Sequence, residues 1–183
     1  MFDWSLFLVS TLLGSSITIS YFLVFTNVSN SFYFDGYVPS YIESPYWFGL
    51  SKNNVYVITS FQLLAALGYI MWIFWICFET DFGSSILRFR WTRSFTLTAF
   101  LLSSTLWPYA AYYYMLYRTI GRSILCCGCL WVASISVIIM LAGTFEANPP
   151  FYATLGILLL SNVVVLADGI GWSAICIQNA LYK

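Results

Sequence analysis

Histidine is absent from this chain of 183 residues, and charge is scarce, with seven basic and seven acidic side chains. Because the chain has no imidazole side chain, three kinds of chemistry are excluded. These are the ligation of haem or a metal by histidine, Ser-His-Asp hydrolysis, and acid–base catalysis by imidazole. The only lysines, Lys52 and Lys183, lie outside the long apolar stretches, which excludes a retinal Schiff base inside a membrane span. No basic run of the kind that binds nucleic acid occurs, so we expect no nucleic-acid partner.

The apolar content is high instead. Hydrophobic residues make up 61% of the chain and aromatic residues 21%, whereas an average soluble domain is roughly 45–50% apolar. Charge-free runs cover residues 4–34, 53–78, 94–117, 123–145 and 147–167. Each run supplies or exceeds the roughly 20 residues that a helix needs to cross a bilayer. The sequence therefore predicts an all-α, polytopic helical membrane protein with about five transmembrane helices in one bundle.

The expected helices form a single membrane domain over residues 1–183, with spans at 5–25, 55–78, 94–116, 123–143 and 151–177. The first span lacks the basic region of a secretory signal, so we interpret it as retained. Five spans place the N-terminus, residues 79–93 and residues 144–150 on one side. We expect an integral multi-pass protein whose partners are the lipid bilayer and either other membrane chains or further copies of itself.

Residues 26–54 form the one long connection in this scheme, and aromatic side chains crowd it. Amphipathic rings settle at the depth of the lipid headgroups. We therefore favour an aromatic segment that follows the membrane interface. The alternatives are a lid over a cavity and a surface that docks a partner.

Small residues recur along the first span, where Ser10, Gly14 and Thr18 are spaced by four. This spacing places them on one helix face and lets a neighbouring helix approach closely. We favour packing within the chain over self-association.

A short basic and aromatic segment precedes the third span. Arg88, Arg90 and Arg93 alternate there with large apolar side chains, a pattern typical of a segment on an anionic lipid surface. We expect these arginines to contact lipid headgroups, with protein docking as the alternative.

Three of the five cysteines, Cys126, Cys127 and Cys129, open the fourth span. Zinc sites combine separated ligand pairs, and the sequence offers no second pair beside this cluster. We therefore expect no metal; helix packing is favoured, followed by palmitoylation. Cys77 and Cys176 are interpreted as isolated core residues.

One acidic residue stands inside an apolar span. Asp168 costs on the order of 2–3 kcal/mol at such a depth, so it should face the bundle interior and find a partner. On a regular helix Ser161, Asp168 and Trp172 share a face, with Asn162 one position around. We favour a structural role, in which Asp168 forms hydrogen bonds with tyrosine, serine or Gln62 of other helices. The functional alternative is an ion or ligand site.

The third span supplies the second candidate site. It contains Trp107-Pro108 in its interior, followed by Tyr109, Tyr112 and Tyr113. Proline removes a backbone hydrogen bond and favours a kink, which opens space between helices. One interpretation is a tyrosine-lined pocket for a ring-shaped or lipid ligand. The alternatives are that the tyrosines lie at the membrane interface or pack against other helices.

These patterns favour a non-catalytic integral membrane protein, a subunit of a larger complex that binds lipid, pigment or partner helices. The alternative is a small transporter, channel or membrane sensor that uses Asp168. A membrane-embedded lipid enzyme ranks lowest, because no nucleophile or second carboxylate accompanies Asp168.

Overall fold

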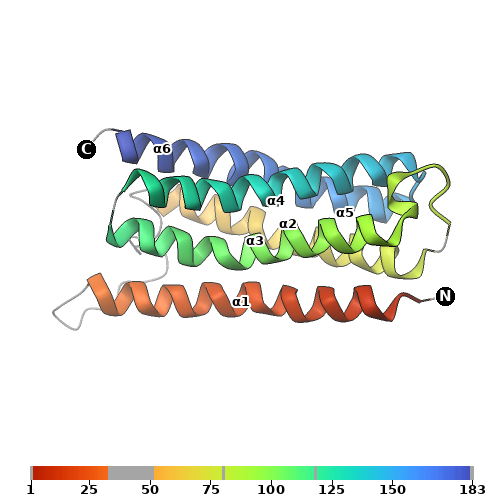
Figure 1. The fold of residues 1–183 in the computed structure, drawn as a ribbon, viewed down its shortest axis with the longest axis horizontal. Helices are drawn as coiled ribbons and strands as arrows, with labels where there is room; N and C mark the ends of the chain where they lie inside the picture. The colour runs from red at the N-terminus through yellow and green to blue at the C-terminus, as the bar shows by residue number, and fades with distance from the viewer. Residues whose placement is uncertain (1, 33–51, 80, 118, 182–183) are drawn as a thin grey trace.

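The computed structural model describes residues 2–32, 52–79, 81–117 and 119–181. Every regular element within these ranges is a helix. The long helices lie side by side, and α1 begins at the end of the bundle opposite to the one where α6 finishes (Figure 1). The all-helical class predicted from the sequence is confirmed for the described residues.

The first four rods are single α-helices: α1 (Trp4–Phe32), α2 (Lys52–Phe78), α3 (Arg90–Leu116) and α4 (Ile120–Glu146). A 3₁₀ turn, η3 (Ile86–Arg88), precedes α3. The fifth rod is continuous but changes its winding. It consists of α5 (Phe151–Ser161), the π-helix η4 (Asn162–Trp172) and α6 (Ser173–Leu181).

Four helical stretches are long and apolar enough to cross a membrane: Trp4–Val24, Asn53–Phe78, Ile120–Glu146 and Phe151–Gln178. The helix α3 has 27 residues but is less apolar, because it begins with Arg90 and Arg93 and carries several hydroxyl side chains. The described chain thus has four to five long apolar helices. This architecture is consistent with an integral multi-pass membrane protein.

The helices extend beyond the spans expected from hydropathy. α1 continues to Phe32 rather than residue 25, α2 begins at Lys52, and α3 begins at Arg90. Apolarity marks only the part of a helix that lies in hydrocarbon, whereas backbone hydrogen bonding continues through polar residues at either end. Residues 26–32 and 52–54 of the expected 26–54 loop are therefore helical, and the remainder, residues 33–51, lies outside the described residues.

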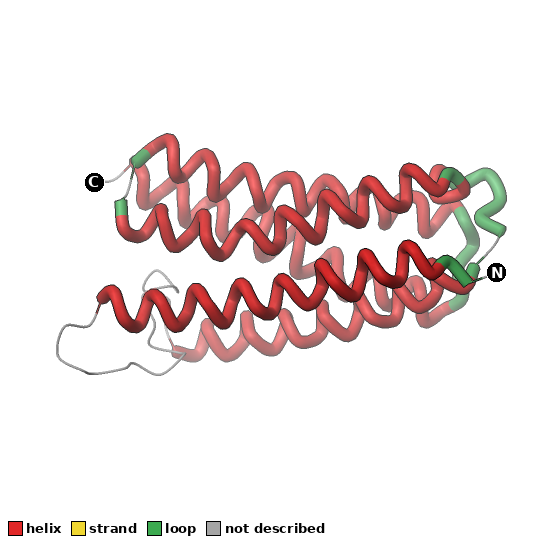
Figure 2. Tube along the Cα trace, turned by 60° about the horizontal axis from the view of Figure 1, so that its bottom comes forward, coloured by secondary structure: helices red, strands yellow, loops and turns green. Residues whose placement is uncertain are grey.

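The helices are arranged as a ring in which some neighbours are consecutive in the sequence and others are not. α1 packs along α3, α3 packs against α4, α4 packs against the fifth rod, and α5 packs against α2. The contact between α1 and α2, which would close the ring, is sparse. Figure 2 shows the same long helices with loops at their ends.

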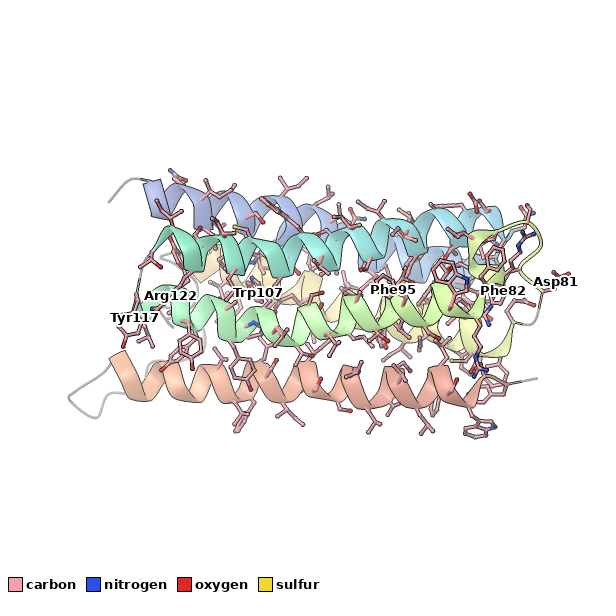
Figure 3. All side chains as sticks on the ribbon, viewed as in Figure 1. Asp81, Phe82, Phe95, Trp107, Tyr117 and Arg122 are labelled. Carbon is pink, nitrogen blue, oxygen red and sulfur yellow. The ribbon has the colours of Figure 1, made fainter. Side chains whose placement is uncertain are left out.

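Buried side chains form two clusters along the bundle axis. The first contains Trp72, Leu97, Val137 and Ile157 and draws on every long helix. The second contains Trp107, Tyr114, Leu130, Cys176 and Trp172. We call the bundle end with Asp81 and Phe82 the N-terminal end and the end with Tyr117 and Arg122 the C-terminal end (Figure 3).

The N-terminal end gathers the first residues, the 79–93 connection and the 144–150 turn, as the count of five spans predicts. The backbone N–H of Asp3 donates to the carbonyl of Cys77 over 2.9 Å. The Ser85 hydroxyl donates to the carbonyl of Gly143 over 2.5 Å. The N–H of Ile86 donates to the Glu146 carboxylate over 3.2 Å. These bonds tie the connections to the helix ends.

A glycine pair brings α2 and α5 together. A Cβ atom added at Gly68 would lie 2.5 Å from the carbonyl oxygen of Gly156, and one at Gly156 would lie 2.7 Å from the carbonyl oxygen of Gly68. The two backbones are therefore in direct contact, as small residues permit in membrane helix packing.

Candidate functional site

A cavity of about 680 Å³ lies inside the ring of helices. Each long helix contributes to its wall, among others through Gly14 and Thr18 of α1, Gln62 and Tyr69 of α2, Phe100 and Trp107 of α3, Leu130 of α4, and Leu160 and Asp168 of the fifth rod. Phe100 and Leu160 belong to the first buried cluster, and Trp107 and Leu130 belong to the second. The cavity is therefore at the junction of the two cores, and its volume is typical of a small-molecule site.

Among the described residues, Asp168 is the only charged one in the cavity wall. Its Oδ1 atom is buried and has no hydrogen-bond partner among the described residues. Gln178, the end of the apolar stretch, is ten residues further on, so Asp168 lies well inside that stretch. A buried carboxylate oxygen without a donor is costly, and a site that keeps one is a candidate for ligand binding.

A second polar atom is left without a partner in the same wall. The Thr59 hydroxyl of α2 is buried and makes no hydrogen bond within the described part of the chain. Gln62, one turn further along α2, also lines the cavity. Polar groups from α2 and η4 therefore belong to a cavity wall that is otherwise mainly apolar and aromatic.

The π-helix sets the position of Asp168. π-helices form i→i+5 hydrogen bonds, are uncommon beyond a single turn, and are frequent at functional sites. Here η4 runs for 11 residues, Asn162–Trp172. The Ser134 hydroxyl of α4 lies 2.8 Å from the carbonyl oxygen of Val164 and 2.8 Å from that of Leu130, and its one hydrogen is shared between these two acceptors. Next to Asp168, a Cβ atom added at Gly169 would overlap the Ser134 hydroxyl, so α4 and η4 are in close contact.

Aromatic side chains close the cavity toward the C-terminal end. The ring centroids of Tyr21 and Trp107 are 5.9 Å apart, and those of Trp107 and Trp172 are 6.1 Å apart. Trp107 lies in that half of the bundle (Figure 3). This layer joins α1, α3 and η4; Tyr21 and Trp107 line the cavity and give a ligand an apolar, polarizable wall, and Trp172 packs against Trp107.

Two of the predicted site residues, Asp168 and Gln62, line the cavity. Ser161 and Asn162 do not line it; both side chains donate to the carbonyl of Leu158 in their own helix. Trp172 is buried against Trp107. The predicted stripe on one face is wrong, because it assumed α-helical winding, and a π-helix changes which residues share a face.

The three predicted tyrosines also lie away from the cavity wall. Tyr109 and Tyr112 are part-buried beside the second cluster. Tyr113 is 53% exposed, and its ring centroid lies 5.7 Å from that of Tyr112. Sequence reasoning selected these residues for their density and missed Trp107, Thr59 and Tyr69. A threonine or tyrosine in a span can face either the lipid or the protein interior, so the sequence does not indicate which of them line a cavity.

The predicted headgroup arginines are engaged to different extents. Arg93 donates to the carbonyl of Leu87 over 2.6 Å, lies 3.8 Å from the Asp3 carboxylate and stacks over the Phe82 ring. Arg90 lies 3.3 Å from the Asp3 carboxylate. Arg88 is exposed and stacks on its neighbour Phe89 over 4.6 Å. Lipid headgroup contact stays a prediction for these residues, of which Arg88 and Arg90 are exposed and Arg93 is part-buried.

The small-residue stripe of α1 faces α2 in part. The Tyr69 hydroxyl donates to the carbonyl of Ser10 over 3.3 Å, and the Tyr69 ring lies 3.8 Å from the position of a Cβ at Gly14. Thr18, the third member, lines the cavity. The stripe thus lies beside both the packing contact and the candidate site.

Cys126, Cys127 and Cys176 lie in the second cluster with Cys129 packed beside it, whereas Cys77 lies in the first cluster. The Sγ atoms of Cys126 and Cys176 are 3.6 Å apart, so Cys176 is not the isolated core residue expected from the sequence. The Cys127 thiol lies 3.8 Å from the carbonyl oxygen of Ser173. Within the described ranges no group of three or more histidine, cysteine, aspartate or glutamate side chains is arranged to hold a metal ion.

Comparison with family models, with curated proteins and with solved structures finds no match to this chain. The proposal that follows is based on the cavity and on Asp168.

Proposed function

We propose that this chain is a non-catalytic integral membrane protein that binds a small, mostly apolar molecule in the cavity between its helices. The observation that carries the proposal is the unpartnered Asp168 carboxylate oxygen in the wall of a cavity of about 680 Å³. Cavities of roughly 300–1,000 Å³ hold drug-sized molecules, and a few polar groups in an apolar wall fix their orientation. Asp168, with Thr59 and Gln62 opposite, supplies such groups.

The chemistry of the wall favours binding over catalysis. A lipid enzyme needs a nucleophile or a second acid–base group beside the carboxylate. Around this cavity the described chain offers one carboxylate, together with hydroxyl and amide groups and the part-buried Cys129 thiol. The lining is suited to holding a ligand.

A transporter, channel or sensor that uses Asp168 is the second candidate. It is favoured by the place of the carboxyl group, deep in a span and beside a cavity, where ionisable residues commonly mark ion and substrate pathways. It is disfavoured because the described residues place no second charged side chain in the wall, whereas pathways commonly combine several such groups. Membership in a larger complex stays compatible with either role.

The test is native purification of the wild type in mild detergent beside Asp168→Asn, followed by mass determination of bound small molecules and partner chains. We expect a bound apolar molecule on the wild type and reduced occupancy on Asp168→Asn. Asp81→Asn removes a carboxylate outside the helices and serves as the control. Equal occupancy of all three proteins, or no bound molecule on any, would overturn the proposal, and partner chains retained by all three would support a subunit role independent of Asp168.

A further inference from the structure

The rim of the cavity is confined to two helices. Among the residues of its wall, the exposed ones are Thr18 and Phe22 of α1 and Leu63, Ala66 and Ile70 of α2. The wall residues from α3, α4 and the fifth rod are buried or part-buried. The cavity therefore reaches the lipid-facing surface of the bundle between α1 and α2.

The seam between α1 and α2 is also where the ring of helices is weakest. Contact between these helices is sparse and includes the Asp3 N–H to Cys77 bond at the N-terminal end and the Tyr69 hydroxyl to Ser10 bond nearby. Thr18 and Phe22 lie further along α1, beyond these bonds. Because Ala66 offers only a methyl group at the rim, a lateral opening needs little rearrangement there.

The charge of the cavity wall indicates which charge the polar group of the ligand should carry. Within the part of the chain that the structure describes, Asp168 is the one charged residue in this wall, and no lysine or arginine side chain lines it. A buried carboxylate is stabilised most by a charged donor, because charge-assisted hydrogen bonds are about twice as strong as neutral ones. An anionic ligand would instead bring two like charges together at low dielectric.

We infer that the ligand is a lipophilic amine, which enters from the bilayer between α1 and α2 and pairs its ammonium group with Asp168 while its apolar body fills the cavity. This inference rests on the proposed function. It deepens that function by naming the class of ligand and the route of entry. The amine partitions into the membrane first and reaches the site sideways, so no aqueous path through the bundle is required.

The head-group arm of the test compares three probes of equal chain length, dodecylamine, dodecanol and dodecanoate, on the protein in lipid nanodiscs. Empty nanodiscs of the same lipid give the background. We expect the wild type and Asp81→Asn to prefer dodecylamine. For Asp168→Asn we expect a loss of dodecylamine affinity of about tenfold or more, since a buried charged partner is removed, with dodecanol binding little changed. Asp168→Glu keeps the charge and should keep the preference.

The route arm compares two substitutions on neighbouring positions of α2. Ala66→Phe fills the rim, whereas Leu67→Phe places the same ring at a position 55% exposed and outside the wall. We expect Ala66→Phe to slow the association of dodecylamine severalfold and Leu67→Phe to leave it unchanged. Equal rates for the two variants would overturn the lateral route.

The outcomes separate the inference from the proposed function. If dodecanol binds as well as dodecylamine and Asp168→Asn changes neither, the cavity binds apolar molecules but the amine inference is wrong. If no probe binds above the empty nanodiscs, the proposed function fails with it. A preference for dodecanoate would overturn the charge argument directly.

Discussion

At the scale of single residues, the contact between Ser134 and Gly169 controls where Asp168 lies. Alanine at Gly169 would place its methyl group on the Ser134 hydroxyl and disturb the bond to Val164. We expect Gly169→Ala to destabilise the protein by about 1–3 kcal/mol, the usual cost of overpacking. Thermal unfolding in detergent measures the change.

A double-mutant cycle isolates this contact. Ser134→Ala removes the hydroxyl that the new methyl group meets, so the combination with Gly169→Ala should recover part of the loss. Strict additivity of the two changes would contradict the overlap described for these side chains. The interhelical hydrogen bond itself is worth only about 0.6 kcal/mol in typical membrane proteins, so Ser134→Ala alone should be mild.

The sequence indicates Asp168 and Gln62 because acidic and amide side chains are rare in apolar runs and must find a protein environment. Thr59 could not be selected in the same way. Threonine is common in spans, where its hydroxyl often bonds the preceding helical turn, as Thr96 and Thr105 do. Only the packing of neighbouring helices shows that the Thr59 hydroxyl lacks such a partner.

At the scale of elements, the number and approximate position of the long helices follow from the charge-free runs. The winding of the fifth rod does not. A change from α to π winding over Asn162–Trp172 depends on contacts with α4, and hydropathy carries no information on them. The predicted face through Ser161 and Asp168 was wrong for this reason, although the prediction that Asp168 faces the interior agrees with its place in the cavity wall.

The contact of α2 with α5 depends on Gly68 and Gly156. We expect Gly68→Ala to destabilise the bundle by about 1–3 kcal/mol, because the backbones must separate to admit a methyl group. Gly128→Ala in α4 is the control, since nothing lies within 4 Å of a Cβ atom there. That control should be neutral or slightly stabilising. Denaturation in detergent compares the two, and equal stabilities would contradict the close approach.

At the scale of the whole molecule, hydropathy predicts a bundle but not the order of helices around it. Apolar faces of similar composition can pack in many arrangements, and no charge pattern distinguishes them. The pairing of α1 with α3, and the cavity that this ring leaves at its centre, are properties of the assembled fold. Polar contacts at the N-terminal end provide one specific constraint on that order.

Asp3 links α1 to both α2 and α3, and it makes the stability of the bundle depend on pH. Partial burial raises the pKa of Asp3, but hydrogen bonds from Ser5 and Leu6 and the charges of Arg90 and Arg93 outweigh it, so the pKa lies below its ordinary value of 3.8. A depressed folded-state pKa contributes stability that is complete above the unfolded pKa and is lost as the pH falls through the folded value.

We therefore expect the wild type to lose stability as the pH falls below about 4, the usual aspartate range. Asp3→Asn should start less stable at neutral pH and lose less over the same interval. Unfolding midpoints of both proteins across this range provide the measurement. Parallel pH profiles would show that the carboxylate of Asp3 is not coupled to folding.

The uneven burial of the helices has a mechanical consequence. Only 17% of the apolar stretch of α1 is buried inside the protein, against 39% for that of α2 and 44% for that of α4. Under a pulling force applied at the N-terminus, the Asp3 contacts would break first and α1 would then leave as a separate step. The remaining helices, joined by the glycine contact and by Ser134, would resist as a unit, so the chain would extend in two stages of unequal strength.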